Sequence, residues 1–145
     1  MHRSQLAGFI IDCQTDDLET AAEFWSRALG LPRRVSKSPE DVDYALLETK
    51  PNDLHIEVQK VDHPSRVHLD IEADDVEAEV RRLEALGAKR LKQIRSWWVM
   101  EAPTGQRFCV VRPSAPTSPP RRTSGSEGAR ADANELSRAL AWAVT

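Results

Sequence analysis

Residues 66–87 read RVHLDIEADDVEAEVRRLEALG, and this stretch decides the fold. Its first half alternates, with Val67 and Leu69 on one face and His68 and Asp70 on the other. A period of two is typical of a half-buried β-strand. The second half changes to a helical period and ends at a glycine that suits a helix C-terminus: Val76, Val80, Leu83, Leu86 and Gly87. The stretch therefore predicts a strand, a tight turn, a helix and a stop.

The same unit occurs earlier in the chain. Residues 11–17 (IDCQTDD) align without a gap with residues 69–75 (LDIEADD), and a helical stripe and a glycine again follow. In each copy the first aspartate of the pair, Asp16 or Asp74, is expected to cap the helix in a capping box. An internal repeat of about 57 residues outweighs local propensities in deciding the fold.

Three short strand-like runs follow each predicted helix. They lie at 31–35, 44–48, 54–59, 90–94, 97–101 and 107–111. The chain is therefore predicted to be α+β, with two tandem βαβββ units at about 6–59 and 66–112 forming one domain over residues 1–112.

Composition excludes several classes of protein. The chain has 145 residues, enough for one domain with a sizeable core, and a net charge of −3. That charge offers no basic field for nucleic acid. No run approaches the roughly 18 apolar residues of a membrane span, and the first residues do not resemble a signal peptide. The two cysteines lie in predicted strands and make no disulfide framework, so a reducing cytoplasm is expected.

The character of the chain changes after residue 112. Residues 113–131 are rich in Pro, Ser and Arg and are predicted to form a disordered linker. Residues 132–145 carry a helical stripe of Leu136, Leu140 and Val144. An isolated helix this short is marginal in water, so this amphipathic helix is expected either to dock on a surface or to fray.

Two motifs support a resemblance to a known family. His68 begins a strand of the form His-x-Asp-x-x-x-Asp-Asp, and residues 97–110 follow the pattern Trp-x-Val…Pro-x-Gly-x-x-Phe-Cys-Val. With the paired βαβββ units, these motifs resemble the vicinal oxygen chelate superfamily. Its glyoxalase-like domains, of the glyoxalase, bleomycin-resistance and dioxygenase type, are the nearest branch. The resemblance covers residues 6–112 and implies a cup-shaped sheet with helices outside.

The resemblance also implies where a metal would be held. Metal-using members place a His or Gln on the first strand of each unit and an acid on the last. His68 and Glu57 stand at two of these positions, while Ile10 and Cys109 stand at the other two. Half of the ligand set is missing, so no cofactor is expected. A divalent metal, if used, would be held by His68 and Glu57.

Strand alternation predicts which side chains point into the cup. If helices cover the face that carries Val67 and Leu69, the opposite face carries a polar set: His55, Glu57, His68, Asp70, Arg107 and Cys109. Neighbouring Trp97 and Trp98 point to opposite faces, and both are kept as ligand-binding candidates beside that set. A structural interpretation stands next to this one, in which His68 pairs with Asp70 or Glu57, and Asp12 pairs with an arginine in a rim network.

Three functions are weighed. In the preferred one, the protein binds a small organic molecule in the cup without a metal, by sequestration or by acid–base chemistry, with His68 and Glu57 as catalytic candidates. In the second, it is a metal-dependent lyase, isomerase or dioxygenase that uses the same two residues. In the third, the domain is a non-catalytic interaction module whose tail helix binds a partner. The sequence does not decide whether the protein is an enzyme, and a homodimer is a further expectation of the resemblance.

Overall fold

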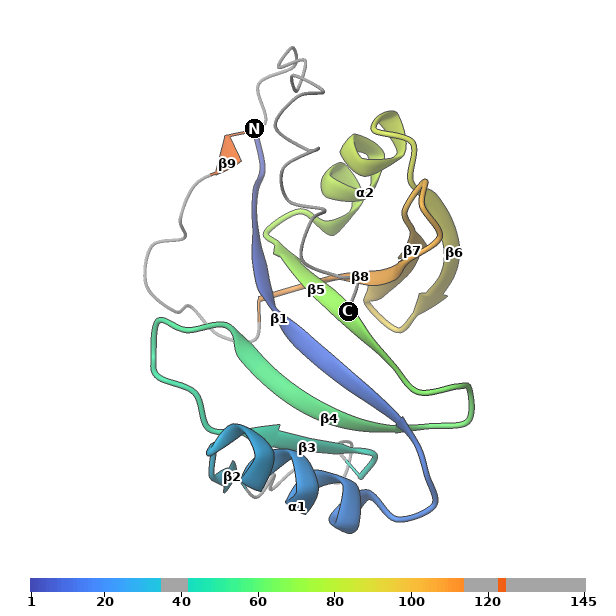
Figure 1. The fold of residues 1–145 in the computed structure, drawn as a ribbon. Helices are drawn as coiled ribbons and strands as arrows, with labels where there is room; N and C mark the ends of the chain where they lie inside the picture. Colours follow the sequence, from blue (N-terminus) through green and yellow to red (C-terminus); the bar gives the residue numbers. More distant parts are fainter. Residues whose placement is uncertain (35–41, 114–122, 125–145) are drawn as a thin grey trace, which may run out of the picture.

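A computed structural model describes residues 1–34, 42–113 and 123–124. The first unit comprises β1 (Arg3–Gln14), α1 (Leu18–Leu29), β2 (Arg33–Arg34), β3 (Tyr44–Leu47) and β4 (His55–Val61). The second comprises β5 (Arg66–Ala73), α2 (Val76–Ala85), β6 (Lys89–Ile94), β7 (Trp97–Glu101) and β8 (Arg107–Val111). The predicted α+β fold of two βαβββ units is confirmed (Figure 1).

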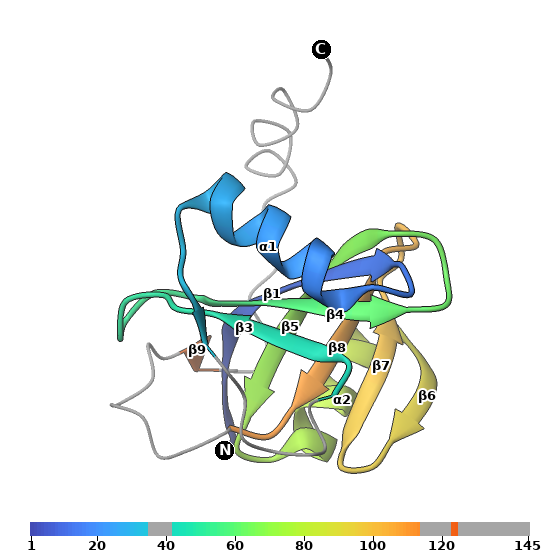
Figure 2. The same cartoon turned by 90° about the horizontal axis from the view of Figure 1, so that it is seen from below.

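The two units share one curved sheet of strand order β2-β3-β4-β1-β5-β8-β7-β6. In each unit the first and last strands pair in parallel, and the antiparallel pairing of β1 with β5 joins the units. Ile10 pairs with His68, its own counterpart in the repeat, so the axis that relates the units passes through this pair. Figure 2 shows α1 covering the half of the sheet formed by β1, β4 and β3, and the other half turned away from it.

Both helices begin one residue later than predicted, because the second aspartate of each pair, Asp17 or Asp75, is the N-cap. The carboxylate of Asp75 accepts a hydrogen bond from the backbone N–H of Ala78 at 2.9 Å. Asp74 instead accepts one from the backbone N–H of Arg3 at 2.7 Å. The predicted capping boxes were therefore wrong, and in the second unit β1 takes up the carboxylate that such a box would use. Both helices do end at the predicted glycines.

Each helix covers a separate apolar core. The core under α1 is formed by Ala22, Ala45, Leu47 and Val58, and the core under α2 by Ala73, Val80, Leu83, Met100, Phe108 and Val110. α1 packs against β3 and β4, and α2 packs against β6, β7, β8 and the end of β5 that carries Ala73, so the start of β5 is left between the two helices (Figure 1). Val67 is 58% exposed and Leu69 40%, so the expectation that a helix covers them was wrong.

The chain beyond β8 is described only at Arg112, at Pro113 and at β9 (Thr123–Ser124), a two-residue strand that pairs with the start of β1. The rest of the predicted linker at 113–131 and the predicted helix at 132–145 lie outside the described residues. Among the helices of the described part, none is long and apolar enough to cross a membrane.

Candidate functional site

The concave face of the sheet surrounds an open cavity of about 2610 Å³. Alternation predicted its lining well, because most of the predicted site residues lie on it: His55, Glu57, His68, Asp70, Trp97, Arg107 and Cys109. Trp98 does not line it. Its ring packs against the core under α2, with the guanidinium of Arg90 5.0 Å from the ring centroid. Of the two tryptophans, Trp97 alone therefore belongs to the candidate site.

His68 is held by a buried carboxylate. Asp12 is 1% exposed, and its Oδ2 accepts a hydrogen bond from His68 Nδ1 at 2.9 Å. The same oxygen lies 3.3 Å from Arg66 Nε and 3.8 Å from His63 Nε2. An imidazole that donates from Nδ1 is fixed in one tautomer, with Nε2 unprotonated while the ring is neutral. Asp12 was expected to pair with an arginine at the rim; it does pair with Arg66, but it is buried and also orients His68.

The other side of the His68 ring faces Asp70. Asp70 Oδ1 lies 3.6 Å from His68 Nε2, and Oδ2 lies 3.9 Å from His55 Nε2. Both distances are too long for hydrogen bonds, and Oδ1 is buried without a hydrogen-bond partner among the described residues. Burial raises the pKa of the Asp70 carboxyl, and the two imidazoles oppose this only in part. Asp70 is thus a carboxyl group that holds its proton more readily than a solvent-exposed aspartate does.

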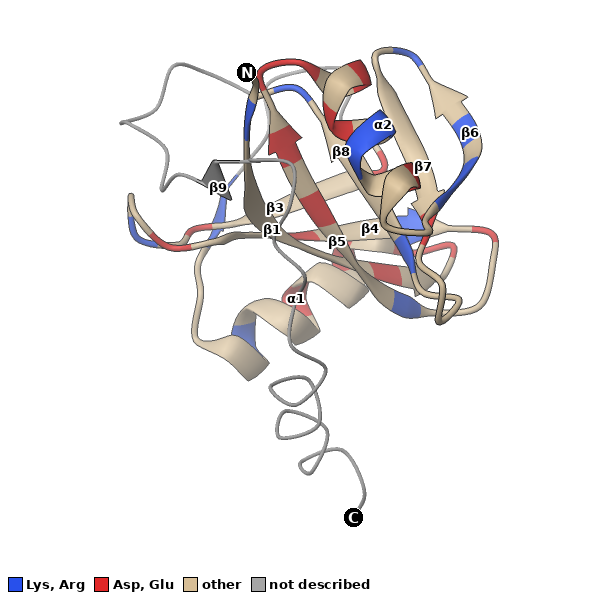
Figure 3. Ribbon diagram, turned by 90° about the horizontal axis from the view of Figure 1, so that it is seen from above, with Lys and Arg blue, Asp and Glu red and all other residues tan. Residues whose placement is uncertain are grey.

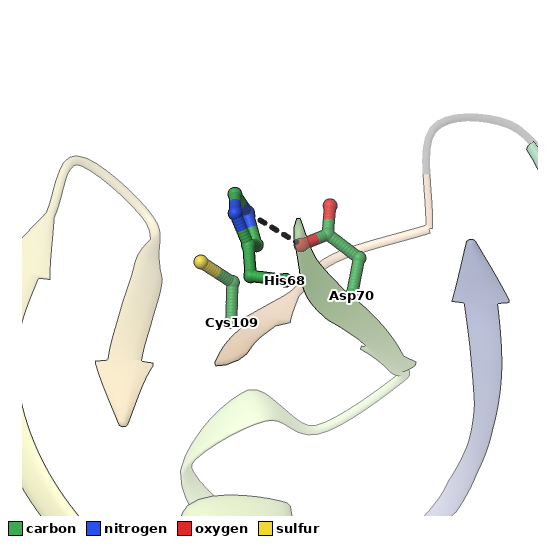
Figure 4. Close-up of side chains that lie close together, drawn as sticks. All are labelled: His68, Asp70 and Cys109. Carbon is green, nitrogen blue, oxygen red and sulfur yellow. Dashed lines mark ion pairs between the residues drawn. The ribbon is translucent and has the colours of Figure 1, made fainter. Parts of the chain in front are cut away.

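Cys109 lies beside this pair because β8 places it opposite Asp70. A ring nitrogen of His68, a carboxylate oxygen of Asp70 and Cys109 Sγ all lie within 4.8 Å of one another (Figure 4). Burial, followed by the negative charges of Asp70 and Asp12, raises the pKa of the Cys109 thiol to about 12. The side chain is therefore a neutral thiol at physiological pH.

Gly8 makes room for His55. It pairs with His55 on one side and with Asp70 on the other, so the three residues form a row across the sheet. A Cβ atom on Gly8 would meet the carbonyl oxygen of His55 and would lie 2.6 Å from its ring. The imidazole therefore lies over the bare backbone of β1 and reaches toward Asp70. Sequence reasoning missed this role, since a glycine inside a strand signals a close approach without naming the partner.

Tyr44 is a cavity residue that the sequence analysis also missed. Its hydroxyl accepts a hydrogen bond from Gln59 Nε2 at 2.9 Å, and burial raises its pKa to about 12. The alternation of β3 could have found it, because Ala45 and Leu47 point into the core and Tyr44 must then face the cup.

The metal set of the superfamily does not fit this cavity. Glu57 and His68 both pair with Ile10, from opposite sides, so the whole width of β1 separates them by about 10 Å between Cα atoms. The ligand between them would have to come from Ile10, whose side chain has no donor atom. His68 and Glu57 are therefore the two donor residues that remain of the superfamily's set, on either side of a residue that offers no donor.

The sheet register also changes one assignment. In the first unit the last strand pairs Gln59 with Asp12, and in the second it pairs Cys109 with Asp70. Cys109 is therefore the counterpart of Gln59, and the counterpart of Glu57 is Arg107, a cation. Among the described residues the one cluster of three donor side chains is His68, Asp70 and Cys109, which is not the set that the superfamily uses.

Comparisons with known proteins place this geometry in a family. A family model for the glyoxalase-like domain matches residues 8–111. The fold is similar to a methylmalonyl-CoA epimerase in complex with methylmalonyl-CoA and NH4+ (17% identity, TM-score 0.58, 81% of this chain and 99% of that chain). It is also similar to a variant of the Streptomyces coelicolor methylmalonyl-CoA epimerase with 2-nitronate-propionyl-CoA (16%, 0.57, 77% and 98%). The epimerase from Mycobacterium tuberculosis is a further match (17%, 0.56, 76% and 90%).

Because these solved structures are so different in sequence from this chain, they show only that the fold is similar. A search of curated proteins by sequence gave no match. The family model, however, spans well over half of the chain. The chain therefore belongs to the glyoxalase-like domain family of the vicinal oxygen chelate superfamily.

Proposed function

We propose that this protein binds a small organic molecule in the cavity and moves a proton on it, without a metal, with His68 as the base. One observation carries the proposal: the buried carboxylate of Asp12 accepts a hydrogen bond from His68 Nδ1 at 2.9 Å. The opposite nitrogen of the ring then offers its lone pair next to Asp70, on the lining of the cavity.

A carboxylate behind an imidazole has two effects on proton transfer. It holds the ring in the tautomer whose Nε2 can accept a proton, and it stabilises the imidazolium that forms. Asp12 can do both because it is fully buried and is itself held by Arg66 at 3.3 Å. A solvated carboxylate would do so less well, since water screens its charge.

Asp70 supplies the complementary acid. Two titratable groups whose environments differ are the usual signature of an acid and a base in one site. His68 Nε2 would take a proton from a carbon next to a carbonyl group, and the C–H electron pair would pass to the carbonyl oxygen. The Asp70 carboxyl, whose pKa burial raises, lies 3.6 Å from the same nitrogen, so it would take the proton from His68 and return it to the carbon, which leaves both groups as they began. The sum of these steps is an isomerisation or epimerisation.

The other predicted site residues are proposed as ligand contacts. Glu57 lies across β1 from His68, so we assign it to ligand binding instead of to the proton-transfer step. His55, Trp97, Arg107 and Cys109 keep the ligand-binding role that was predicted for them. The similarity of the fold to methylmalonyl-CoA epimerases supports a substrate that carries a carbonyl group.

The proposal is tested by deuterium exchange. The full chain, treated with a chelator, is incubated in D2O with methylmalonyl-CoA and, separately, with 2-oxobutyrate, and incorporation at the carbon next to the carbonyl is followed by NMR. We expect incorporation with at least one probe, its loss in His68→Gln, and its retention in the matched control His2→Gln, which lies outside the cavity lining. Binding of the probes without exchange would instead support sequestration, and exchange that survives His68→Gln would remove His68 from the reaction.

A further inference from the structure

The two walls of the cavity carry opposite charge. The wall from the second unit contributes five cations and two acids: Arg66, Lys92, Arg95, Arg107, Arg112, Asp70 and Glu72. The wall from the first unit contributes three cations and six acids: Arg34, Lys50, Lys60, Asp12, Asp16, Asp43, Glu48, Asp53 and Glu57. Figure 3 shows the basic residues of the second unit along β6. An anionic ligand is therefore attracted to one wall only.

Some of these cations are already neutralised. Arg66 Nε lies 3.3 Å from Asp12 Oδ2, and Arg107 Nε lies 3.2 Å from Glu101 Oε2. Lys92 and Arg112 form no ion pair with any described residue. The uncompensated positive charge is thus displaced from His68 toward the far end of the wall.

The strand register places Arg95 and Arg112 at one corner of the cavity. β6 and β7 are joined by a two-residue turn that begins with Arg95, and Ile94 pairs with Trp97 across it. β7 and β8 are antiparallel, and Trp98 pairs with Val110, so the end of β8 lies beside this turn. Arg112 directly follows that end. Arg95, Trp97 and Arg112 therefore share one corner of the cavity, and all three line it.

The backbone at this corner gives a second, independent observation. Arg95 has φ 51° and is the one residue other than glycine with a positive φ in the described part of the chain. A turn of this kind normally places glycine at its first position, because a Cβ atom there crowds the backbone. Strained positions of this sort concentrate at ligand-binding sites. An arginine here keeps a guanidinium at the mouth of the cavity at the expense of backbone stability.

We infer that the corner formed by Arg95, Trp97 and Arg112 binds an anionic group of the ligand, a phosphate or a carboxylate. The flat part of the ligand would lie against Trp97. The inference rests on the proposed function, since it describes the other end of the same ligand. Trp97 lies two strands across the sheet from His68 and four residues further along it. The distance between the two residues over the surface is therefore roughly 16 Å. The substrate class is therefore an elongated organic anion whose charge is remote from the reacting carbon.

The test uses three probes that share an aromatic ring: phenyl phosphate, phenylacetate and the neutral benzyl alcohol. Binding to the full chain is measured by calorimetry and by tryptophan fluorescence. We expect at least one of the anions to bind at least tenfold more tightly than benzyl alcohol, with an affinity that falls as salt is added. The double variant Arg95→Gln, Arg112→Gln should lose that preference, and the control Lys89→Gln, on β6 but outside the cavity lining, should keep it.

A further variant separates folding from binding. Arg95→Gly removes the crowded Cβ, so it should raise Tm while it lowers the affinity for the anion. Anions that bind no more tightly than benzyl alcohol would overturn the inference, as would a double variant that binds them like the native chain. His68→Gln should abolish deuterium exchange and leave phenyl phosphate binding within threefold of the native value. The two proposals therefore fail in different measurements.

Discussion

Asp12 and Asp70 occupy the same position in the two copies of the repeat, yet their surroundings are opposite. Asp12 is buried with three basic side chains within 3.8 Å of one carboxylate oxygen. Oδ1 of each aspartate is buried without a hydrogen-bond partner among the described residues, but the imidazole nitrogen nearest to Asp70 is 3.6 Å away, too far for a hydrogen bond. A duplicated unit has thus supplied two identical acids with two different environments.

One difference between the copies is central to this result. The axis of the repeat passes through the pair formed by Ile10 and His68, so each aspartate flanks the same histidine from its own side. His68 donates to Asp12 through Nδ1, and its Nε2 then faces Asp70. Arg66 beside Asp12 and Cys109 beside Asp70 add to the difference, because their counterparts in the repeat are Gly8 and Gln59. The asymmetry of the site therefore begins with this pair and is extended by its neighbours.

The largest expected effect compares the same substitution at the two acids. Asp12→Asn should lower the rate of proton exchange by on the order of 10³, because the amide can present its NH₂ to the ring and favour the wrong tautomer. Asp70→Asn should lower it by roughly 10², the lower end of the usual size of a lost acid or base contribution. Exchange rates in D2O with the probe that the native chain accepts measure both. Equal losses would mean that the two acids have the same role.

Stability should change in opposite directions in the same two variants. Asp12→Asn should lower the free energy of unfolding by about 2 kcal/mol, because it leaves Arg66 and its neighbours without a buried counter-charge. Asp70→Asn should raise it by roughly 1 kcal/mol at pH 7, because an ionised carboxylate with too few partners is removed. Urea denaturation of both variants decides this, and destabilisation by Asp70→Asn would show that its carboxylate is well satisfied.

The gain from Asp70→Asn should depend on pH. The folded-state pKa of Asp70 is raised above its unfolded value, so the folded chain binds more protons and loses stability as pH rises through that range. The native chain and Asp70→Asn should therefore differ most at neutral pH, and the difference should vanish below about pH 4, where both states hold the proton. A difference that stays constant from pH 4 to pH 7 would contradict the raised pKa.

The smallest effect concerns the thiol between the two acids. The pKa of Cys109 is raised to about 12 by burial and then by Asp70 ahead of Asp12. Both variants should therefore speed the alkylation of Cys109 by iodoacetamide at pH 9. The rate in Asp70→Asn should be about threefold higher than the rate in Asp12→Asn. Mass spectrometry follows the rate at which Cys109 is alkylated in each variant and in the native chain. A higher alkylation rate in Asp12→Asn would mean that Asp12 raises the pKa of Cys109 more than Asp70 does.

The sequence predicted the fold because a gapless repeat and two clear periodicities need no tertiary information. It also predicted most of the cavity lining, since alternation assigns His68 and Asp70 to one face once the other is apolar. It could not predict that His68 meets Asp12, because this depends on the register between β1 and β5, which shifts between Leu6 and Gly8. The exposure of Val67 and Leu69 was missed for a similar reason, because periodicity does not say which strands of the sheet a helix covers.

The tautomer of His68 tests the central claim most directly. Nitrogen-15 NMR of the full chain at a pH where the ring is neutral reports which nitrogen carries the proton. We expect the proton on Nδ1, with Nε2 free, and a loss of that preference in Asp12→Asn. A proton on Nε2 in the native chain would contradict the account, because His68 would then have no lone pair facing Asp70 and the cavity.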